Sequence, residues 1–336
     1  MIAPAAPEAV SDRRRQLVRQ FKDNNSVLIL LLFLVAGFAF VDGFGKNVSN
    51  IIYYSSVYGL SALGLGLIMI TGEIDLSAGF QAGFAGVFSV LSFNMVYNAT
   101  GNSVLSLIVC IIGAVVMGGL MGVLNGFIVT KLGISSLIGT IAINYAYKGL
   151  VFYWANSSFK PEDADIVKLI AKTKIFGWKW LTPAFLIFIA LVVVVFLWMR
   201  YTRFGNRLHP VGDNPEAAAY AGISTTNTKW VAYILSGVLA GVCGFFMVSN
   251  AGYAIYGQGN SLETFIISCC VIGGIKMQGG KGTAIHVLIG ILIMRSIQQI
   301  MSCLFLAADV VNFITGVLLI LVLVIDRFTS NKSADD

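Results

Sequence analysis

The residues best suited to chemistry in this chain lie in a glycine-rich stretch, Cys270-Val-Ile-Gly-Gly-Ile-Lys-Met-Gln-Gly-Gly-Lys-Gly-Thr283. Glycine-rich loops offer backbone N–H groups, and lysine offers a positive charge, so the stretch could suit phosphate. The spacing argues against a nucleotide site, because Ile275 stands where the first P-loop glycine belongs and Gly282 where a Ser or Thr is required. We therefore expect a glycine-broken helix end, formed by Gly273, Gly274, Gly279, Gly280 and Gly282.

Other residue types that serve catalysis or metal binding are sparse. Neither of the two histidines, His209 and His286, belongs to an H-E-x-x-H sequence. The five cysteines form no CxxC pair and lie in or beside apolar segments, at Cys110, Cys243, Cys269, Cys270 and Cys303. These patterns predict no metal site, no cofactor, no disulfide framework and no covalent chemistry by this chain.

Length and composition indicate a membrane protein. The chain has 336 residues, of which 57% are hydrophobic and 11% charged, whereas an ordinary soluble domain carries about 25% charged residues. Many apolar runs reach the length of about 20 residues that a helix needs to cross a bilayer. The net charge of +6 is distributed between these runs rather than on one soluble face, so it indicates membrane topology rather than nucleic-acid binding.

The apolar runs predict an all-α polytopic membrane protein with about ten spanning helices. They cover residues 27–41, 50–71, 78–97, 104–130, 135–155, 182–200, 228–249, 262–278, 284–301 and 309–326. Arginines precede the first run and no A-x-A cleavage site follows it, which favours an uncleaved span over a signal peptide. An even number of spans then places both termini in the cytoplasm. The expected parts are a cytoplasmic tail (1–26), a transmembrane domain (27–326) and a second cytoplasmic tail (327–336).

Small residues recur at four-residue spacing in three of these spans. Such spacing lines one helical face and allows helix backbones to approach closely in lipid. We expect these residues to serve helix packing rather than ligand binding: Gly79 and Gly83, Gly118, Gly122 and Gly126, and Gly237 and Gly241.

Polar residues within the spans are candidates for a translocation path. Arg295 is the one charge deep within a span, and an arginine there must face protein or water. The uncharged candidates are equally suited to hydrogen bonds between helices, an alternative that the sequence leaves open. The candidate path residues are Asn125, Asn144, Tyr145, Arg295, Gln299 and Asn312, with Gln298 beside them.

Acidic residues bear on an alternative function, that of an ion-coupled carrier. Such a carrier ordinarily places a carboxylate or a broken-helix ion site near the membrane midplane. The acidic candidates here all fall near the ends of predicted spans, which counts against this alternative: Asp42, Glu73, Asp75, Glu263, Asp309 and Asp326.

A polar connection from Arg200 to Ile223 is expected on the cytoplasmic face, with a helix of seven to nine residues inside it. Asn214 can cap this helix, Pro215 suits its first turn, Glu216 favours its positive N-terminal end, and Gly222 suits its C-terminal stop. These features fit an ordinary loop helix as well as a helix that enters a partner's groove.

Family resemblance favours the second interpretation. The run Glu216-Ala-Ala, followed by Gly222, resembles the E-A-A-x-x-x-G element of ABC importer permeases. The longer run from Gly212 to Ile223 is similar to the form in the ribose, xylose and arabinose permease family, although Ala221 stands where that pattern usually has serine.

Two further stretches are similar to the same family, so the resemblance covers residues 48–326. One is the glycine-rich stretch already described. The other is Thr71-Gly-Glu-Ile-Asp-Leu-Ser-Ala-Gly79, in which Glu73 replaces a glycine of the family pattern. Its polar residues Glu73, Asp75 and Ser77 are expected in a cytoplasmic turn, where Gly72 ends one helix and Asp75 or Ser77 caps the next.

The resemblance implies the permease subunit of a bacterial ABC importer in the inner membrane. It implies a monosaccharide as the solute, with nucleosides or another small polar solute as an alternative. The implied partners are a cytoplasmic ATPase, an extracytoplasmic solute-binding protein and a second, identical or related permease. The ATPase would dock on a coupling helix that includes Gly212, Asn214, Glu216, Ala217, Ala218, Gly222 and Ile223.

The longest outward loop, residues 156–181, combines apolar residues with lysines and ends in Phe176, Trp178 and Trp180. It predicts a short amphipathic helix and aromatic residues at the membrane surface. Anchoring in the interface and docking of a binding protein are both consistent with this pattern.

Overall fold

The computed structural model describes residues 32–35, 37–39, 47–155, 159–178, 180–255 and 257–332. In these ranges the chain is almost entirely helical, and Phe159 and Ala254 form the one isolated β-bridge. The predicted all-α fold is therefore confirmed for the described part. Most of the predicted first span and the N-terminal tail lie outside the described residues.

The helices follow the predicted apolar runs closely. The structure contains α3 (Val48–Ile70), α4 (Ala78–Thr100), α5 (Ser103–Gly126) with a π-helical extension η2 (Phe127–Lys131), α6 (Ser136–Trp154), α7 (Ala164–Lys172), η3 (Ile175–Gly177), α8 (Pro183–Tyr201), α9 (Gly205–Asp213), α10 (Pro215–Tyr220), α11 (Thr225–Ala251), α12 (Leu262–Gly273), α13 (Ala284–Cys303) and α14 (Ala308–Lys332).

The predicted count of ten spans is not confirmed. Six described helices are long and apolar enough to cross a membrane: α3, α4, α5 with η2, α8, α11 and α13. Helix α12 is only 12 residues long, because it ends at Gly273 and Gly274 rather than continuing to the predicted residue 278. Helix α6 has the length of a span but is not one of the six.

Local sequence explains where several helices begin. Thr182 accepts a hydrogen bond from the Phe185 N–H, and Pro183 occupies the first turn of α8. Asn102 accepts from the N–H groups of Val104 and Leu105 at the start of α5. These side chains satisfy backbone donors that a helix leaves unpaired at its N-terminus.

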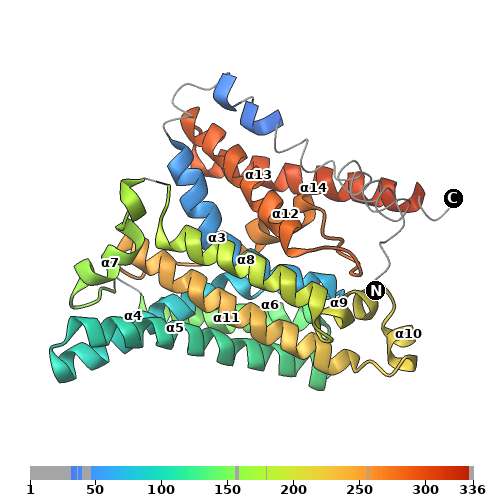
Figure 1. Cartoon of the computed structure of the whole chain (residues 1–336), viewed down its shortest axis with the longest axis horizontal. Coiled ribbons are helices and arrows are strands. Elements are labelled where there is room, and N and C mark those ends of the chain that lie inside the picture. Colours follow the sequence, from blue (N-terminus) through green and yellow to red (C-terminus); the bar gives the residue numbers. More distant parts are fainter. Residues whose placement is uncertain are drawn as a thin grey trace, which may run out of the picture.

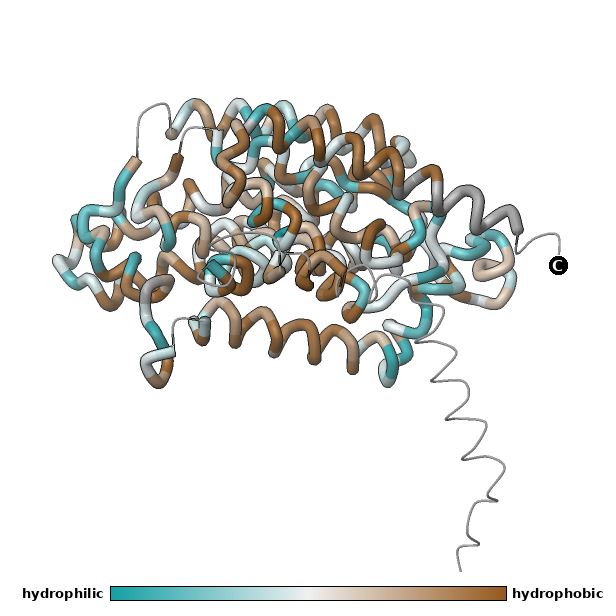
Figure 2. Tube along the Cα trace, turned by 90° about the horizontal axis from the view of Figure 1, so that it is seen from above, coloured by the Kyte–Doolittle hydropathy of each residue, from teal (hydrophilic) through white to brown (hydrophobic). Residues whose placement is uncertain are grey.

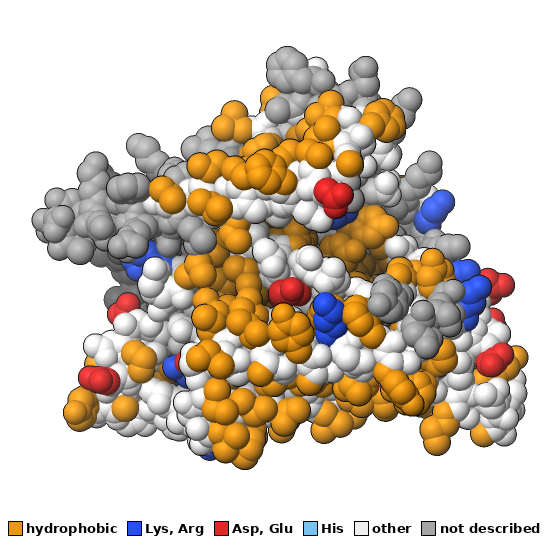
Figure 3. Space-filling view, turned by 180° about the vertical axis from the view of Figure 1, so that it is seen from behind, with side chains coloured by type: hydrophobic (Ala, Val, Ile, Leu, Met, Phe, Trp, Pro, Cys, Tyr) orange, Lys and Arg blue, Asp and Glu red, His pale blue; other side chains and the backbone are white. Residues whose placement is uncertain are grey.

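The long helices lie side by side, with α10 at one end of the bundle and α7 at the opposite end (Figure 1). Brown, apolar tube covers the long helices, and teal segments gather toward the two ends (Figure 2). The space-filling view shows hydrophobic side chains over much of one face and only a few charged ones (Figure 3). This distribution is that of a protein whose flanks contact lipid.

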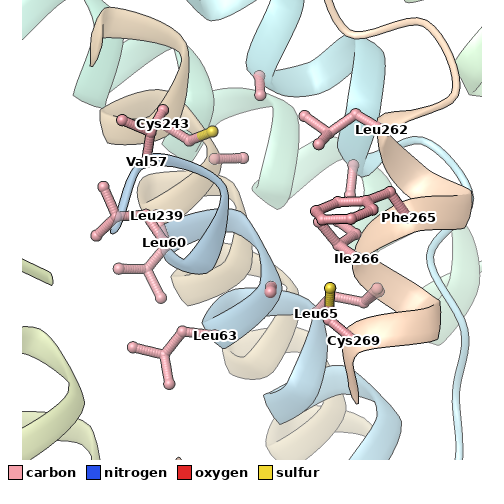
Figure 4. Close-up of a cluster of buried hydrophobic side chains, with 14 of the residues drawn as sticks. Val57, Leu60, Leu63, Leu65, Leu239, Cys243, Leu262, Phe265, Ile266 and Cys269 are labelled. Carbon is pink, nitrogen blue, oxygen red and sulfur yellow. The ribbon is translucent and has the colours of Figure 1, made fainter. Parts of the chain in front are cut away.

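The centre of the bundle is formed by α3. Its residues Val57, Leu60 and Leu65 are buried, and Figure 4 shows the side chains of α3 between those of α11 and α12. On α11, Cys243 faces this cluster, and on α12, Phe265 does. Helix α3 therefore packs against both α11 and α12.

The small residues serve close packing between α5 and α11. A Cβ atom added to Gly118 would lie 2.3 Å from the carbonyl oxygen of Gly237, and one added to Gly237 would lie 2.3 Å from that of Gly118. A Cβ atom on Gly241 would lie 2.3 Å from the Ala114 carbonyl oxygen. These contacts confirm the predicted helix-packing role, because only glycine permits such close backbones.

Candidate functional site

Three segments singled out from the sequence converge at the α10 end of the bundle. They are the turn after α3 (residues 71–77), helix α9, and the glycine-rich loop between α12 and α13 (residues 274–283). The Gly280 N–H donates a hydrogen bond to the carbonyl oxygen of Ile70 at 3.0 Å. The Nδ1 atom of His209, on α9, lies 3.0 Å from the Gly280 carbonyl oxygen. We call these three segments the coupling end.

Glycine is required in the coupling end because backbones meet there without side chains between them. A Cβ atom on Gly212 would lie 1.9 Å from the Ile70 carbonyl oxygen and 2.6 Å from the Gly280 nitrogen. A Cβ atom on Gly279 would lie 2.7 Å from the Gly72 nitrogen. The glycine-rich stretch is thus a helix end that packs against its neighbours, as its spacing indicated.

The loop conformation requires glycine at further positions. Gly279 has φ +89°, Gly280 +75° and Gly282 +146°, and Gly274 after α12 has +109°. Residues with a Cβ atom rarely adopt such positive φ values. Gly273 has an ordinary φ, but a Cβ atom there would lie 2.0 Å from the His286 carbonyl oxygen.

Helix α10 has the ends that the sequence predicted. The Asn214 side chain accepts a hydrogen bond from the Ala217 N–H at 2.9 Å, and Glu216 lies in the first turn. Gly222 adopts φ +79°. Its N–H donates to the Ala219 carbonyl oxygen, and the Ile223 N–H donates to that of Ala218. The helix is six residues long, shorter than the predicted seven to nine, and α9 precedes it as a separate helix.

Two of the three alanines of α10, Ala217 and Ala218, differ in their surroundings. Ala218 is buried at 4% exposure, whereas Ala217 is exposed. Tyr220, at the end of the same helix, is 94% exposed. The exposed residues of α10 are Pro215, Glu216, Ala217, Ala219 and Tyr220, whereas Ala218 faces the permease itself.

The turn after α3 contains an ion pair and a buried hydrogen-bond network. Gly72 ends α3 with φ +81°, as predicted. Glu73 Oε1 lies 2.6 Å from Nζ of Lys229 on α11. Ser77 precedes α4 but makes no side-chain cap; its Oγ and its N–H both donate to Asp75 Oδ1, at 2.6 and 2.8 Å.

The buried network continues from Asp75 to α5 and α6. Asn125 Nδ2 donates to Ser77 Oγ at 2.7 Å and contacts Asp75 Oδ2 at 3.3 Å. The Tyr147 hydroxyl donates to Asn125 Oδ1 at 2.8 Å. On α6, Thr140 Oγ1 accepts from the Leu76 N–H at 3.0 Å. Asn125 thus uses its amide to join helices, which is one of the two roles that the sequence left open.

The burial of Asp75 bears on one argument made from the sequence. Asp75 follows a predicted span end, yet it is 1% exposed and enclosed by α5 and α6. Burial raises the pKa of the Asp75 carboxyl, and the hydrogen bonds from Ser77 and Asn125 act in the opposite direction. Asp75 is therefore interior, but it lies in the turn at the α10 end of the bundle and not at the middle of a helix, so the argument against an ion-coupled carrier stands.

Arg295 and Asn312, two of the candidate path residues, line a cavity of about 400 Å³. Gln298 also lines it. The other path candidates do not line it: Gln299 donates to Cys303 Sγ, Tyr145 is 69% exposed, and Asn144 lies on α6. The sequence reasoning missed several lining residues: Tyr58, Asn260, Ser261, Thr264 and Thr315. Tyr54 and Tyr58 are four residues apart, a spacing that places both rings on one face of a helix. This spacing was the sequence signal for the aromatic wall of the cavity.

A second cavity of about 320 Å³ adjoins the first, since Tyr58 and Met247 line both. Tyr53, Tyr54, Asn250 and Gln258 are further lining residues. No described residue that lines either cavity is an Asp or Glu.

The ion pair offers a first test of the coupling end. We expect Glu73→Lys and Lys229→Glu each to lower the thermal stability of the purified protein, because each places like charges beside one another. The exchanged double variant should recover most of the loss, with a coupling energy of about 1 kcal/mol. Thermal unfolding of the four proteins in detergent measures these changes in stability. A double variant whose loss of stability equals the sum of the two single losses would contradict the pairing.

Known proteins resemble this chain over most of its length. The family model described as "Branched-chain amino acid transport system / permease component" matches residues 47–323. The autoinducer 2 import system permease protein LsrC of Klebsiella pneumoniae is 30% identical over 281 residues, covering 84% of this chain and 78% of that protein. LsrC of Yersinia enterocolitica is 29% identical, with coverages of 91% and 84%.

A further relative is the L-arabinose transport system permease protein AraH of Escherichia coli. It is 28% identical over 307 residues, which cover 90% of this chain and 89% of AraH. No solved structure matches the chain.

Proposed function

This chain belongs to the branched-chain amino acid transport system / permease component family, and we propose that it conducts a monosaccharide across the bacterial inner membrane as a permease subunit of an ABC importer. It is a transport subunit and not an enzyme, because ATP hydrolysis in such importers is done by a separate subunit. The family places it in the membrane as a multi-pass protein, and it implies an ATPase and a solute-binding protein as partners.

The observation that carries the proposal is the coupling end. Three segments distant in sequence pack against one another there. One of them, α9, leads directly into a capped helix, α10, which has an exposed face. In the proposed arrangement the ATPase contacts Glu216, Ala217 and Tyr220, and this end, together with both chain termini, is cytoplasmic. The domains are a cytoplasmic tail (1–26), the transmembrane domain (27–326) and a C-terminal tail (327–336).

The solute assignment rests on relatives. AraH is by name an L-arabinose permease and LsrC an autoinducer 2 permease, and the polar cavity beside Arg295 fits a small polar solute. A nucleoside is the alternative solute. A second permease subunit, identical or related, would complete the translocation path.

ATP-driven uptake tests the proposal. The chain, co-purified with its ATPase and binding protein in vesicles, should accumulate labelled L-arabinose or another monosaccharide when ATP is supplied. Collapse of the proton gradient should leave this uptake unchanged. Uptake that stops with the gradient, or that needs no ATPase, would favour the ion-coupled carrier instead.

The opposite end has a preformed surface for the binding protein. Helix α7 is fixed to α11, because Ser249 Oγ donates to the Val167 carbonyl oxygen at 2.6 Å and accepts from the Ala171 N–H. The preceding loop is fixed to α4, since Asn94 Nδ2 donates to the Lys160 carbonyl oxygen. Leu169, by contrast, is 61% exposed.

We expect Leu169→Glu to weaken stimulation of the ATPase by loaded binding protein, because a charge replaces an apolar contact. The rate of the ATPase without binding protein should stay unchanged. The matched variant Val167→Glu replaces a buried neighbour and should instead reduce the yield of folded protein. Deletion of residues 162–174 would combine both effects, so the point variants are the sharper test; normal stimulation in Leu169→Glu contradicts docking on α7.

A further inference from the structure

Arg295 is held in the larger cavity by aromatic rings rather than by a carboxylate. Its guanidinium carbon lies 4.7 Å from the ring centre of Tyr54 and 5.7 Å from that of Tyr58, both on α3. Its Nη1 donates to Gln298 Oε1. Within the described chain its buried Nε has no hydrogen-bond partner. Cation–π contacts offset part of the cost of the charge, and Arg295 lines the cavity without a carboxylate partner among the described residues there.

The cavity wall around Arg295 combines aromatic faces with small polar groups. Tyr54 and Tyr58 stack with ring centres 5.9 Å apart, and Phe265 meets Tyr58 edge-on at 6.0 Å. Asn312 and Thr315 of α14 face the same space. The volume of about 400 Å³ lies within the range of small-molecule sites, about 300 to 1,000 Å³.

The charge of the cavity is positive and uncompensated by its described lining. The acidic residue nearest in sequence to that lining, Glu263, is directed away from the cavity, because its Oε2 would lie 2.2 Å from a Cβ atom on Gly79 of α4. The carboxylate therefore belongs to the α4 side of α12. A cation entering the cavity would meet Arg295 at short range, where like charges repel each other.

We propose that this cavity is a solute-binding station for an uncharged polyhydroxylated molecule, with Arg295 donating to its oxygens, and that it rejects cationic solutes. This inference rests on the proposed function. It adds a binding site for the solute and the exclusion of cations from that site. The ring faces of Tyr58 and Phe265 suit the C–H surface of a sugar ring, and Asn312 and Thr315 supply further hydrogen bonds. Tyr58 and Arg295 lie near the middle of α3 and α13, so a solute would meet the station within the bundle.

Thiol labelling of the purified chain tests the charge of the station without any partner protein. In Asn312→Cys, an anionic methanethiosulfonate should react faster than a cationic one, by about tenfold at low salt. Adding Arg295→Met should abolish that preference, and Arg295→Lys should retain it. Asn98→Cys, on the exposed outer end of α4, is the matched control whose reactivity should ignore Arg295. The chain with Asn312 intact gives the background of the five native cysteines.

Protection by solute tests the binding step. L-Arabinose, D-ribose or D-glucose should slow labelling of Asn312→Cys, whereas D-glucosamine, which differs from D-glucose by an ammonium group, should not. Protection should be lost with Arg295→Met and with Arg295→Lys, since the planar donor edge is absent in both. The proposal is overturned if the reagent preference survives Arg295→Met, if none of the three sugars protects, or if they protect equally without Arg295. ATP-driven uptake, measured separately, decides the proposed function independently of these outcomes.

Discussion

Ala217→Arg should abolish ATP-driven uptake while the permease still inserts and folds. The side chain of Ala217 is exposed on α10, so an arginine there disturbs a partner's groove and nothing inside the permease. Loss of about 1.4 kcal/mol of docking energy lowers the occupancy of a weak complex about tenfold, and we expect uptake to fall by at least that factor. Co-purification of the ATPase with the variant measures the docking directly.

Ala218→Arg is the matched control. Its side chain is buried against the permease, so the same substitution places an unpaired charge in the interior and should lower the yield of monodisperse protein. Family resemblance groups the two alanines as docking residues, and the structure separates their expected effects. Uptake and ATPase binding at normal levels in Ala217→Arg would refute docking on the exposed face of α10.

Gly212→Ala should have the largest effect of any single methyl group in the coupling end. The new Cβ atom would lie 1.9 Å from a carbonyl oxygen and 2.6 Å from a backbone nitrogen, and neither atom can rotate away. Overpacking of this kind costs about 1 to 3 kcal/mol or more, and α9 must shift away from α3 to relieve it. We expect a lower melting temperature and, because α9 leads directly into α10, loss of coupled uptake even in molecules that remain folded.

Gly149→Ala provides the comparison for Gly212→Ala. Gly149 lies within α6 with open space around the added Cβ atom, and alanine favours helix by about 1 kcal/mol. Its melting temperature should stay level or rise, and uptake should remain. If Gly212→Ala behaves in the same way, the backbone contact between α9 and α3 contributes neither to stability nor to coupled uptake.

Elements whose signals are local were predictable from the sequence. The apolar runs place most helices within a few residues of their observed ends, because burial in lipid or protein depends on consecutive apolar residues. Asn214 and Gly222 act as predicted at the ends of α10, since a cap needs only near neighbours. The glycines of α5 and α11 likewise pack as predicted.

Features that depend on contacts between distant residues were not predictable. Asp75 looked like a surface turn residue, and its burial requires Asn125 and Tyr147 from two other helices. The partners of Arg295 lie on α3, far from it in sequence. The predicted span 262–278 also ran past the end of α12, although the helix break predicted at Gly273 and Gly274 marks where α12 stops. The periodicity of apolar residues along the sequence does not tell which helix faces pack against each other.

The direct backbone contacts at Gly212 and Gly279 make the coupling end stiff. A load applied to α10 reaches the base of α3 with no compressible layer to absorb it. Helix α3 then acts as a lever of 23 residues, about 34 Å long, which carries Tyr58 near its middle and Tyr54 one turn further from the base. A tilt of about 5° at its base would displace those rings by about 2 Å. A shift of that size alters the contact of both rings with Arg295, so movement at the coupling end is transmitted through α3 to the cavity.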